Sequence, residues 1–181
     1  MQERILSTAD RLFYSSGIRA IGVDTVAAEI GISKRTLYNY FPSKDALVIA
    51  YLTRRYVVPK PSDEAPLAQI LAAFDRMERW FGNENFRGCP FVNAVTEWGD
   101  AATKIAIDFK EQRRQWFKEL LTRLNAVDPD SLATQLAILV EGAMSAALVR
   151  RDPGLARAAK RAATVLMGAA GVQGAAGPLG S

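Results

Sequence analysis

One short stretch of the chain combines hydrogen-bond donors with positive charge. Residues 33–40 read Ser-Lys-Arg-Thr-Leu-Tyr-Asn-Tyr, and Leu37 is their only aliphatic residue. A helix of this composition cannot bury most of its surface, but its hydroxyl, amide and cationic groups suit the phosphates and base edges of DNA. The pattern therefore predicts that residues 34–40 form a recognition helix for the major groove.

The composition removes several other kinds of chemistry. The 181 residues include no histidine and one cysteine, Cys89. Catalysis by Ser-His-Asp or Cys-His groups is thereby excluded, and a single cysteine cannot form an intramolecular disulfide or a thiolate cluster. We find no paired-carboxylate, phosphate-loop or metal-ligand pattern, so we predict no catalytic residue, no metal site and no cofactor. The cysteine content also favours a reducing cytoplasm.

Positive charge is concentrated in the first third of the chain, although the net charge is only +4. Within residues 31–60 the bases are Lys34, Arg35, Lys44, Arg54, Arg55 and Lys60, and the one acid is Asp45. A basic patch is typical of proteins that bind the phosphate backbone, but a solvated helical face gives the same composition. The charge alone does not decide between the two.

The elements that must position these residues are helices. Apolar residues recur with helical spacing almost everywhere, and the alternation of strands is nearly absent. The spacing predicts an all-α fold of about nine helices. We expect a helix-turn-helix DNA-binding domain in residues 1–50, a regulatory and dimerisation domain in residues 51–170 after a proline-marked boundary, and a disordered tail in residues 171–181.

Residues 23–40 meet the packing needs of a helix-turn-helix. Two short helices that cross need a small residue at the crossing and a residue tolerant of left-handed backbone in the turn. Ala27 supplies the first and Gly31 the second. Ser33 is placed to cap the second helix. The remaining apolar positions, Val26, Ile30, Ile32 and Leu37, provide a shared core.

The stretch from Gly31 to Val48, Gly-Ile-Ser-Lys-Arg-Thr-Leu-Tyr-Asn-Tyr-Phe-Pro-Ser-Lys-Asp-Ala-Leu-Val, resembles the DNA-binding signature of the tetracycline-repressor (TetR) family. In that signature a glycine turn, a Leu-Tyr-x-aromatic-Phe helix and a Lys-Asp/Glu-x-Leu helix start follow one another. A weaker resemblance covers residues 88–94 and the two closing helices. The resemblance implies a homodimer whose amino-terminal domains bind a palindromic operator in double-stranded DNA and whose carboxy-terminal domains bind a small-molecule inducer.

The resemblance also implies roles for individual residues. Thr25 and Tyr38 would contact phosphates, with Tyr40 beside them where many relatives have histidine. Lys44, at a helix start, would also reach phosphate. The residues facing the groove would be Lys34, Arg35, Thr36 and Asn39, and of these Arg35 suits a bidentate contact to guanine. For each residue the alternative is an exposed solvating side chain or, for Tyr38, partial burial.

The run from Leu132 to Val149 lies in a predicted helix that is apolar on nearly every side, so it must be covered on every side. A partner subunit is the economical cover, and a buried central helix in a monomer is the alternative. Gln135, Glu141 and Ser145 interrupt the apolar run, so we interpret it as a buried helix and expect no membrane partner. The interface we predict comprises Leu136, Val140, Ala143, Ala147, Leu155, Ala159, Ala162 and Leu166.

Aromatic residues are dense between residues 74 and 117, and ligand sites are commonly apolar cavities with a few polar groups. The pocket we predict comprises Trp80, Phe91, Asn93, Trp98, Phe109, Gln112, Arg113 and Trp116. Ordinary core packing and exposed polar faces explain the same residues.

The function that these patterns favour is a DNA-binding transcriptional repressor, not an enzyme. A small, largely apolar ligand would release it from its operator. One alternative is a helical enzyme that uses the aromatic-lined cavity. The other is a regulator that binds DNA constitutively or under the control of a protein partner.

Overall fold

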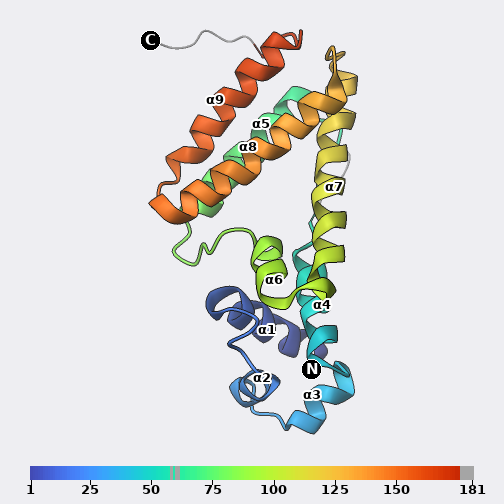
Figure 1. Cartoon of the computed structure of the whole chain (residues 1–181), viewed down its shortest axis with the longest axis vertical. Coiled ribbons are helices and arrows are strands. Elements are labelled where there is room, and N and C mark those ends of the chain that lie inside the picture. Colours follow the sequence, from blue (N-terminus) through green and yellow to red (C-terminus); the bar gives the residue numbers. More distant parts are fainter. Residues whose placement is uncertain (58, 60–61, 176–181) are drawn as a thin grey trace. The chain divides into compact units, whose positions relative to one another are not determined.

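The computed structural model describes residues 1–57, 59 and 62–175, and over these residues it contains helices and no strand (Figure 1). The predicted all-α fold is therefore confirmed. The helices are α1 (Gln2–Ser16), α2 (Val23–Glu29), α3 (Lys34–Tyr40), α4 (Lys44–Arg55), α5 (Pro66–Phe81), α6 (Pro90–Trp98), α7 (Asp100–Arg123), α8 (Pro129–Arg150) and α9 (Gly154–Ala169).

Side-chain caps explain where several helices begin. The hydroxyl oxygen of Ser33 accepts a hydrogen bond from the backbone N–H of Thr36 at 3.0 Å, and Ser43 accepts one from Ala46 at 3.0 Å. These caps satisfy N–H groups that have no partner within their own helix. Asp128 caps α8 in the same way, through the N–H of Ser131 at 3.1 Å.

The described chain divides into two compact units. The amino-terminal unit joins Met1–Val57 to Cys89–Phe109, and the carboxy-terminal unit joins the described residues of Val58–Gly88 to those of Lys110–Ser181. This differs from the predicted boundary at residue 50, because α6 and the start of α7 group with α1 to α4. The contacts responsible join residues far apart in the chain, which local patterns do not reveal.

The core of the amino-terminal unit lies between α1 and its neighbours α2 and α4. Phe13 of α1 and Tyr51 of α4 are buried and meet edge to face, with ring centroids 5.6 Å apart. The guanidinium of Arg55 donates to Asp10 across the same pair of helices at 3.0 Å. These contacts hold α4, and therefore Lys44 at its start, in a set position on α1.

The carboxy-terminal unit is a helical bundle in which α5, α8 and α9 pack against one another (Figure 1). α8 is the one helix among the described residues that is long and apolar enough to span a membrane by length and composition. However, Glu141 lies within it and forms ion pairs with Lys110 and Arg113 of α7. A paired charge in the middle of the helix fits the interior of a protein bundle, where a charge needs a partner.

The predicted dimer interface needs correction, because much of it lies inside a single protomer. Among its residues, Leu136, Val140, Ala143, Ala147 and Ala159 are each less than 9% exposed, while Leu155, Ala162 and Leu166 are half-buried. α5 and α9 of the same chain pack against α8. The exposed stripe of α8 consists instead of Ser131, Thr134, Gln135, Ile138, Gly142, Ser145 and Val149.

The predicted disordered tail also differs from the structure where the two can be compared. Val172 and Ala175 are each 2% exposed, and the N–H of Val172 donates to the carbonyl of Met167 at 3.0 Å. Residues 171–175 are thus packed after α9, because Val172 supplies a buried apolar side chain. Residues 176–181 lie outside the described residues.

Candidate nucleic-acid interface

α2 and α3 are joined by a tight turn at Gly31. This glycine has φ of 70°, and the N–H of Ile32 donates back to the carbonyl of Ala27 at 3.0 Å. Only glycine adopts this left-handed backbone without strain. Of the predicted shared core, Val26 and Leu37 are buried, as is Ala27, while Ile30 and Ile32 are half-buried. The turn therefore sets the angle at which α3 leaves α2.

Gly31→Ala tests this turn. The added Cβ would meet nothing within 4 Å, so the expected cost comes from the backbone alone, about 1–2 kcal/mol of unfolding free energy. Urea denaturation measures it. Gly31→Asn is the matched control, because asparagine tolerates left-handed backbone and should cost less. Equal losses for both variants would contradict this account.

α3 buries Leu37 and leaves most of its remaining surface in solvent. Leu37 is 0% exposed, whereas Tyr38 and Tyr40 are 38% and 43% exposed. Thr36 is half-buried, and its hydroxyl lies 2.8 Å from that of Ser33 within the cap. The exposed residues predicted to contact DNA are Thr25, Lys34, Arg35, Tyr38, Asn39 and Tyr40. The structure therefore brings these side chains to the surface of one helix-turn-helix.

The two cations of α3 differ in their surroundings. The ammonium of Lys34 forms an ion pair with Asp24 of α2 at 2.9 Å, and the hydrogen bond to Asp24 raises the pKa of Lys34. Arg35 is exposed and forms no ion pair within the part of the chain that the structure describes. Arg35 is therefore the cation of α3 whose guanidinium is available to a new partner.

Lys44, at the first turn of α4, lies over an aromatic ring. Its ammonium is 4.5 Å from the ring centroid of Trp98, at the end of α6. The Trp98 indole N–H also donates to Asp45 at 2.6 Å. Burial lowers the pKa of Lys44, and the carboxylates of Asp45 and Glu97 oppose that change. Trp98 thus holds the start of α4 and does not line the pocket described below.

The neighbouring Glu97 contacts the connection between α1 and α2. Its carboxylate accepts a hydrogen bond from the N–H of Arg19 at 3.1 Å. It also lies so close to Gly17, whose φ is 92°, that a Cβ there would come within 2.8 Å of a carboxylate oxygen. The sequence offers no local signal for these contacts, since Glu97 and Arg19 are 78 positions apart.

The eight residues predicted for the ligand pocket lie in several places. In the amino-terminal unit, Phe91 and Phe109 stack with centroids 4.1 Å apart, and Tyr56 packs edge to face on both. Asn93 is half-buried on α6. In the carboxy-terminal unit, the Trp80 ring packs on that of Phe86. These rings fill space with one another.

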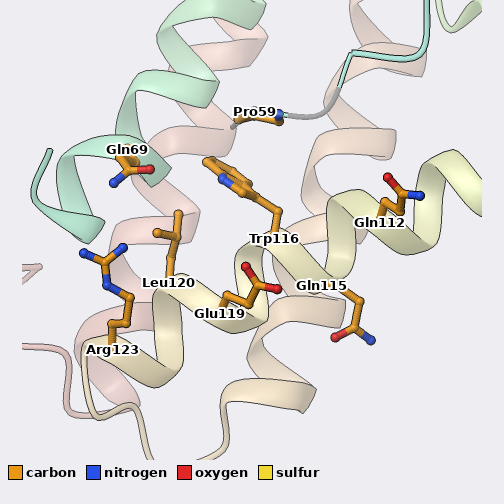
Figure 2. Close-up of a pocket in the computed structure, with 8 residues that line it drawn as sticks. All are labelled: Pro59, Gln69, Gln112, Gln115, Trp116, Glu119, Leu120 and Arg123. Atoms are coloured by element: carbon orange, nitrogen blue, oxygen red, sulfur yellow. The ribbon is translucent and has the colours of Figure 1, made fainter. Parts of the chain in front are cut away.

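Two of the predicted residues, Gln112 and Trp116, do line a pocket in the carboxy-terminal unit (Figure 2). Arg113 lies on the same helix but forms an ion pair with Glu141. The pocket has a volume of about 230 Å³, and its other lining residues are Pro59, Gln69, Gln115, Glu119, Leu120 and Arg123. Sequence reasoning missed these six because only the folded unit brings Pro59 and Gln69 beside this part of α7.

Both parts of the chain are similar to known proteins. A sequence profile described as bacterial regulatory proteins, tetR family, matches residues 5–51, and one described as a tetracyclin repressor-like C-terminal domain matches residues 66–163. The Escherichia coli HTH-type transcriptional regulator YjdC is 28% identical over 83% of this chain and 85% of its own length. The Mycolicibacterium smegmatis HTH-type transcriptional regulator EthR is 30% identical over 84% of this chain and 76% of its own length.

A solved structure is similar over almost the whole chain. The crystal structure of a TetR-type transcriptional regulator from Streptomyces avermitilis has a TM-score of 0.83 and 31% identity, and the match covers 95% of this chain and 98% of that one. Both regions of the chain are thus matched in sequence and in fold.

Proposed function

This chain belongs to the tetR family of bacterial regulatory proteins and is a DNA-binding transcriptional regulator, and from that premise we propose that it is a repressor released by a small molecule. The repressor binds a palindromic operator as a homodimer in the cytoplasm. A small, largely apolar molecule that enters the carboxy-terminal unit lowers its affinity for the operator.

The observation that carries the DNA-binding part of this proposal is the surface of α3, where one buried leucine is surrounded by exposed donors. Arg35 is exposed and forms no ion pair with any residue that the structure describes, so we assign it the base contact in the major groove. Thr25, Tyr38 and Lys44 bind phosphates, with Tyr40 beside them. Lys34, Thr36 and Asn39 complete the face toward the groove. The ion pair between Lys34 and Asp24 competes with any contact between Lys34 and DNA.

The contacts of α6 support a route for release. The chain joins α6 to the carboxy-terminal unit at residues 88–89 and, through α7, at residues 109–110. At its other end, Glu97 and Trp98 contact Arg19, Lys44 and Asp45 of the amino-terminal unit. A ligand that favours a displaced α6 would shift the population toward a placement of α3 and α4 that no longer fits the operator.

Two further features of the carboxy-terminal unit support a homodimer. The exposed stripe of α8 carries Ile138 and Val149, which are 64% and 80% exposed, and α9 exposes Val165 at 52%. Small residues, Gly142 and Ser145, lie between the apolar ones and permit close approach. A homodimer formed through two such faces has twofold symmetry and two recognition helices. These match the two half-sites of a palindrome.

The experiment that tests the proposal selects bound fragments from a library of bacterial genomic DNA. We expect a palindromic consensus, and binding whose logarithm falls linearly with the logarithm of salt concentration. Screening small apolar compounds against the selected fragment should then find one that releases the protein. Bound fragments without a shared palindrome would contradict the operator proposal, and constitutive binding in the presence of pocket-filling compounds would contradict release.

A further inference from the structure

The pocket between α5 and the second half of α7 contains a buried hydrogen-bond donor. Trp116 is 6% exposed, and its indole nitrogen finds no hydrogen-bond partner among the described residues. In Figure 2 the indole points from α7 toward Gln69 of α5, and both side chains line the same pocket. A buried donor without a partner costs stability, so an acceptor in the pocket would be bound favourably.

The side chains around this donor limit the chemistry of the occupant. The indole nitrogen donates only, so the atom that meets it must be an acceptor. The indole ring and Leu120 supply an apolar wall. The amide of Gln69, 5% exposed, donates to the carbonyls of Ser62 and Glu64 and is already held in place.

Charge at the edge of the pocket argues against an ionic occupant. Glu119 and Arg123 both line the pocket, are exposed, and make no ion pair within the described ranges. Their charges are opposite, so together they add no net charge to the pocket. An anion would be attracted by Arg123 but repelled by Glu119, and a cation would be attracted by Glu119 but repelled by Arg123. A neutral molecule avoids both conflicts.

We infer that this pocket binds a small, neutral carbonyl compound whose oxygen accepts a hydrogen bond from Trp116, an inference that rests on the proposed small-molecule control. The apolar part of the compound lies against the indole ring and Leu120. The volume of about 230 Å³ is below the roughly 300–1,000 Å³ usual for drug-sized ligands, so the occupant is a smaller molecule. Its carbonyl oxygen satisfies the buried indole donor, which has no partner among the described residues.

The test follows the indole N–H groups of the full chain by two-dimensional NMR while acetophenone is added. The chain has three tryptophans, so three indole signals are expected, and Trp116→Phe identifies one of them. Acetophenone should shift the Trp116 signal in a saturable manner and in the direction of hydrogen bonding. Ethylbenzene, in which a CH₂ group replaces the carbonyl, should bind more weakly and cause no such shift. Benzoate should bind more weakly than acetophenone because of Glu119.

The variants give a second measurement. Trp116→Phe keeps a ring in the wall but removes the donor, so acetophenone should bind about five-fold more weakly. Trp80→Phe is the matched control and should leave binding unchanged, because Trp80 packs on Phe81 and Phe86 away from the pocket. A Trp116 signal unmoved by acetophenone, an equal response to ethylbenzene, or tighter binding of benzoate would each overturn the inference.

Operator binding measured in parallel separates this inference from the proposed function. If acetophenone saturates the Trp116 signal while operator affinity is unchanged, the site stands and the proposed release fails. If an apolar compound releases the operator while the Trp116 signal stays in place, release stands and this site is overturned.

Discussion

Ile138→Glu should convert the proposed homodimer into monomers at micromolar concentration. Ile138 is 64% exposed in one protomer and lies in the middle of the exposed stripe of α8. In a twofold interface the glutamate would be buried beside its copy in the partner, and an unpaired buried charge costs several kcal/mol. We therefore expect the dimer dissociation constant to rise by at least about a hundred-fold. Sedimentation velocity measures this directly.

Ile107→Glu is the matched control for this substitution. Ile107 is 61% exposed, almost the same as Ile138, but it lies on α7 in the amino-terminal unit. The control should remain dimeric with an unchanged circular dichroism spectrum. Operator binding by Ile138→Glu should fall steeply, because each monomer holds only one half-site. A dimeric Ile138→Glu protein would show that the interface lies elsewhere.

The correction of the interface shows a limit of helical periodicity. α8 is apolar on nearly every side, and this predicts that it must be covered on every side, by its own chain alone or with a partner subunit. Periodicity does not say which side each covers. Leu136 and Ile138 are equally apolar in the sequence, yet the first is 0% exposed and the second 64% exposed. The difference arises because α5 and α9 of the same chain occupy one side of α8.

The helix-turn-helix was predictable because its determinants are local. Gly31 ends one helix, Ser33 caps the next, and Leu37 is the single apolar residue of α3, so the bounds Lys34–Tyr40 follow from the sequence. The partner of Lys44 was not predictable. Trp98 lies 53 positions from Asp45, to which it donates, and its aromatic character alone suggested a ligand wall. Only the fold brings the end of α6 to the start of α4.

The aromatic residues show the same limit. Their density between residues 74 and 117 predicts burial, but it does not distinguish a cavity from a packed core. Phe91 and Phe109 stack on each other, whereas Trp116 leaves a polar atom unpaired beside open volume. The feature that distinguishes the pocket is thus a buried donor without a hydrogen-bond partner among the described residues. Such a feature depends on the folded structure and cannot be inferred from composition.

Arg35→Ala and Lys44→Ala should weaken operator binding in different ways. Arg35 is exposed on α3 and has no ion pair in the described part of the chain, so its loss should remove about 1–3 kcal/mol of discrimination between the operator and an operator with one altered guanine. Lys44 contacts only phosphate in this assignment. Its loss should weaken all sequences alike and reduce the slope of binding against salt by about one. Fluorescence anisotropy across a salt series measures both quantities.

Arg54→Ala is the control for the removal of a positive charge from the same unit, because Arg54 is already paired with Glu3. It should change sequence preference less than Arg35→Ala does, and the salt slope less than Lys44→Ala does. Lys34→Ala should have a smaller effect than Arg35→Ala, since Lys34 gives up its ion pair with Asp24 to reach DNA. If Arg35→Ala and Lys44→Ala instead weakened every sequence equally, Arg35 would be a phosphate contact, and the base contacts would fall to the uncharged donors of α3.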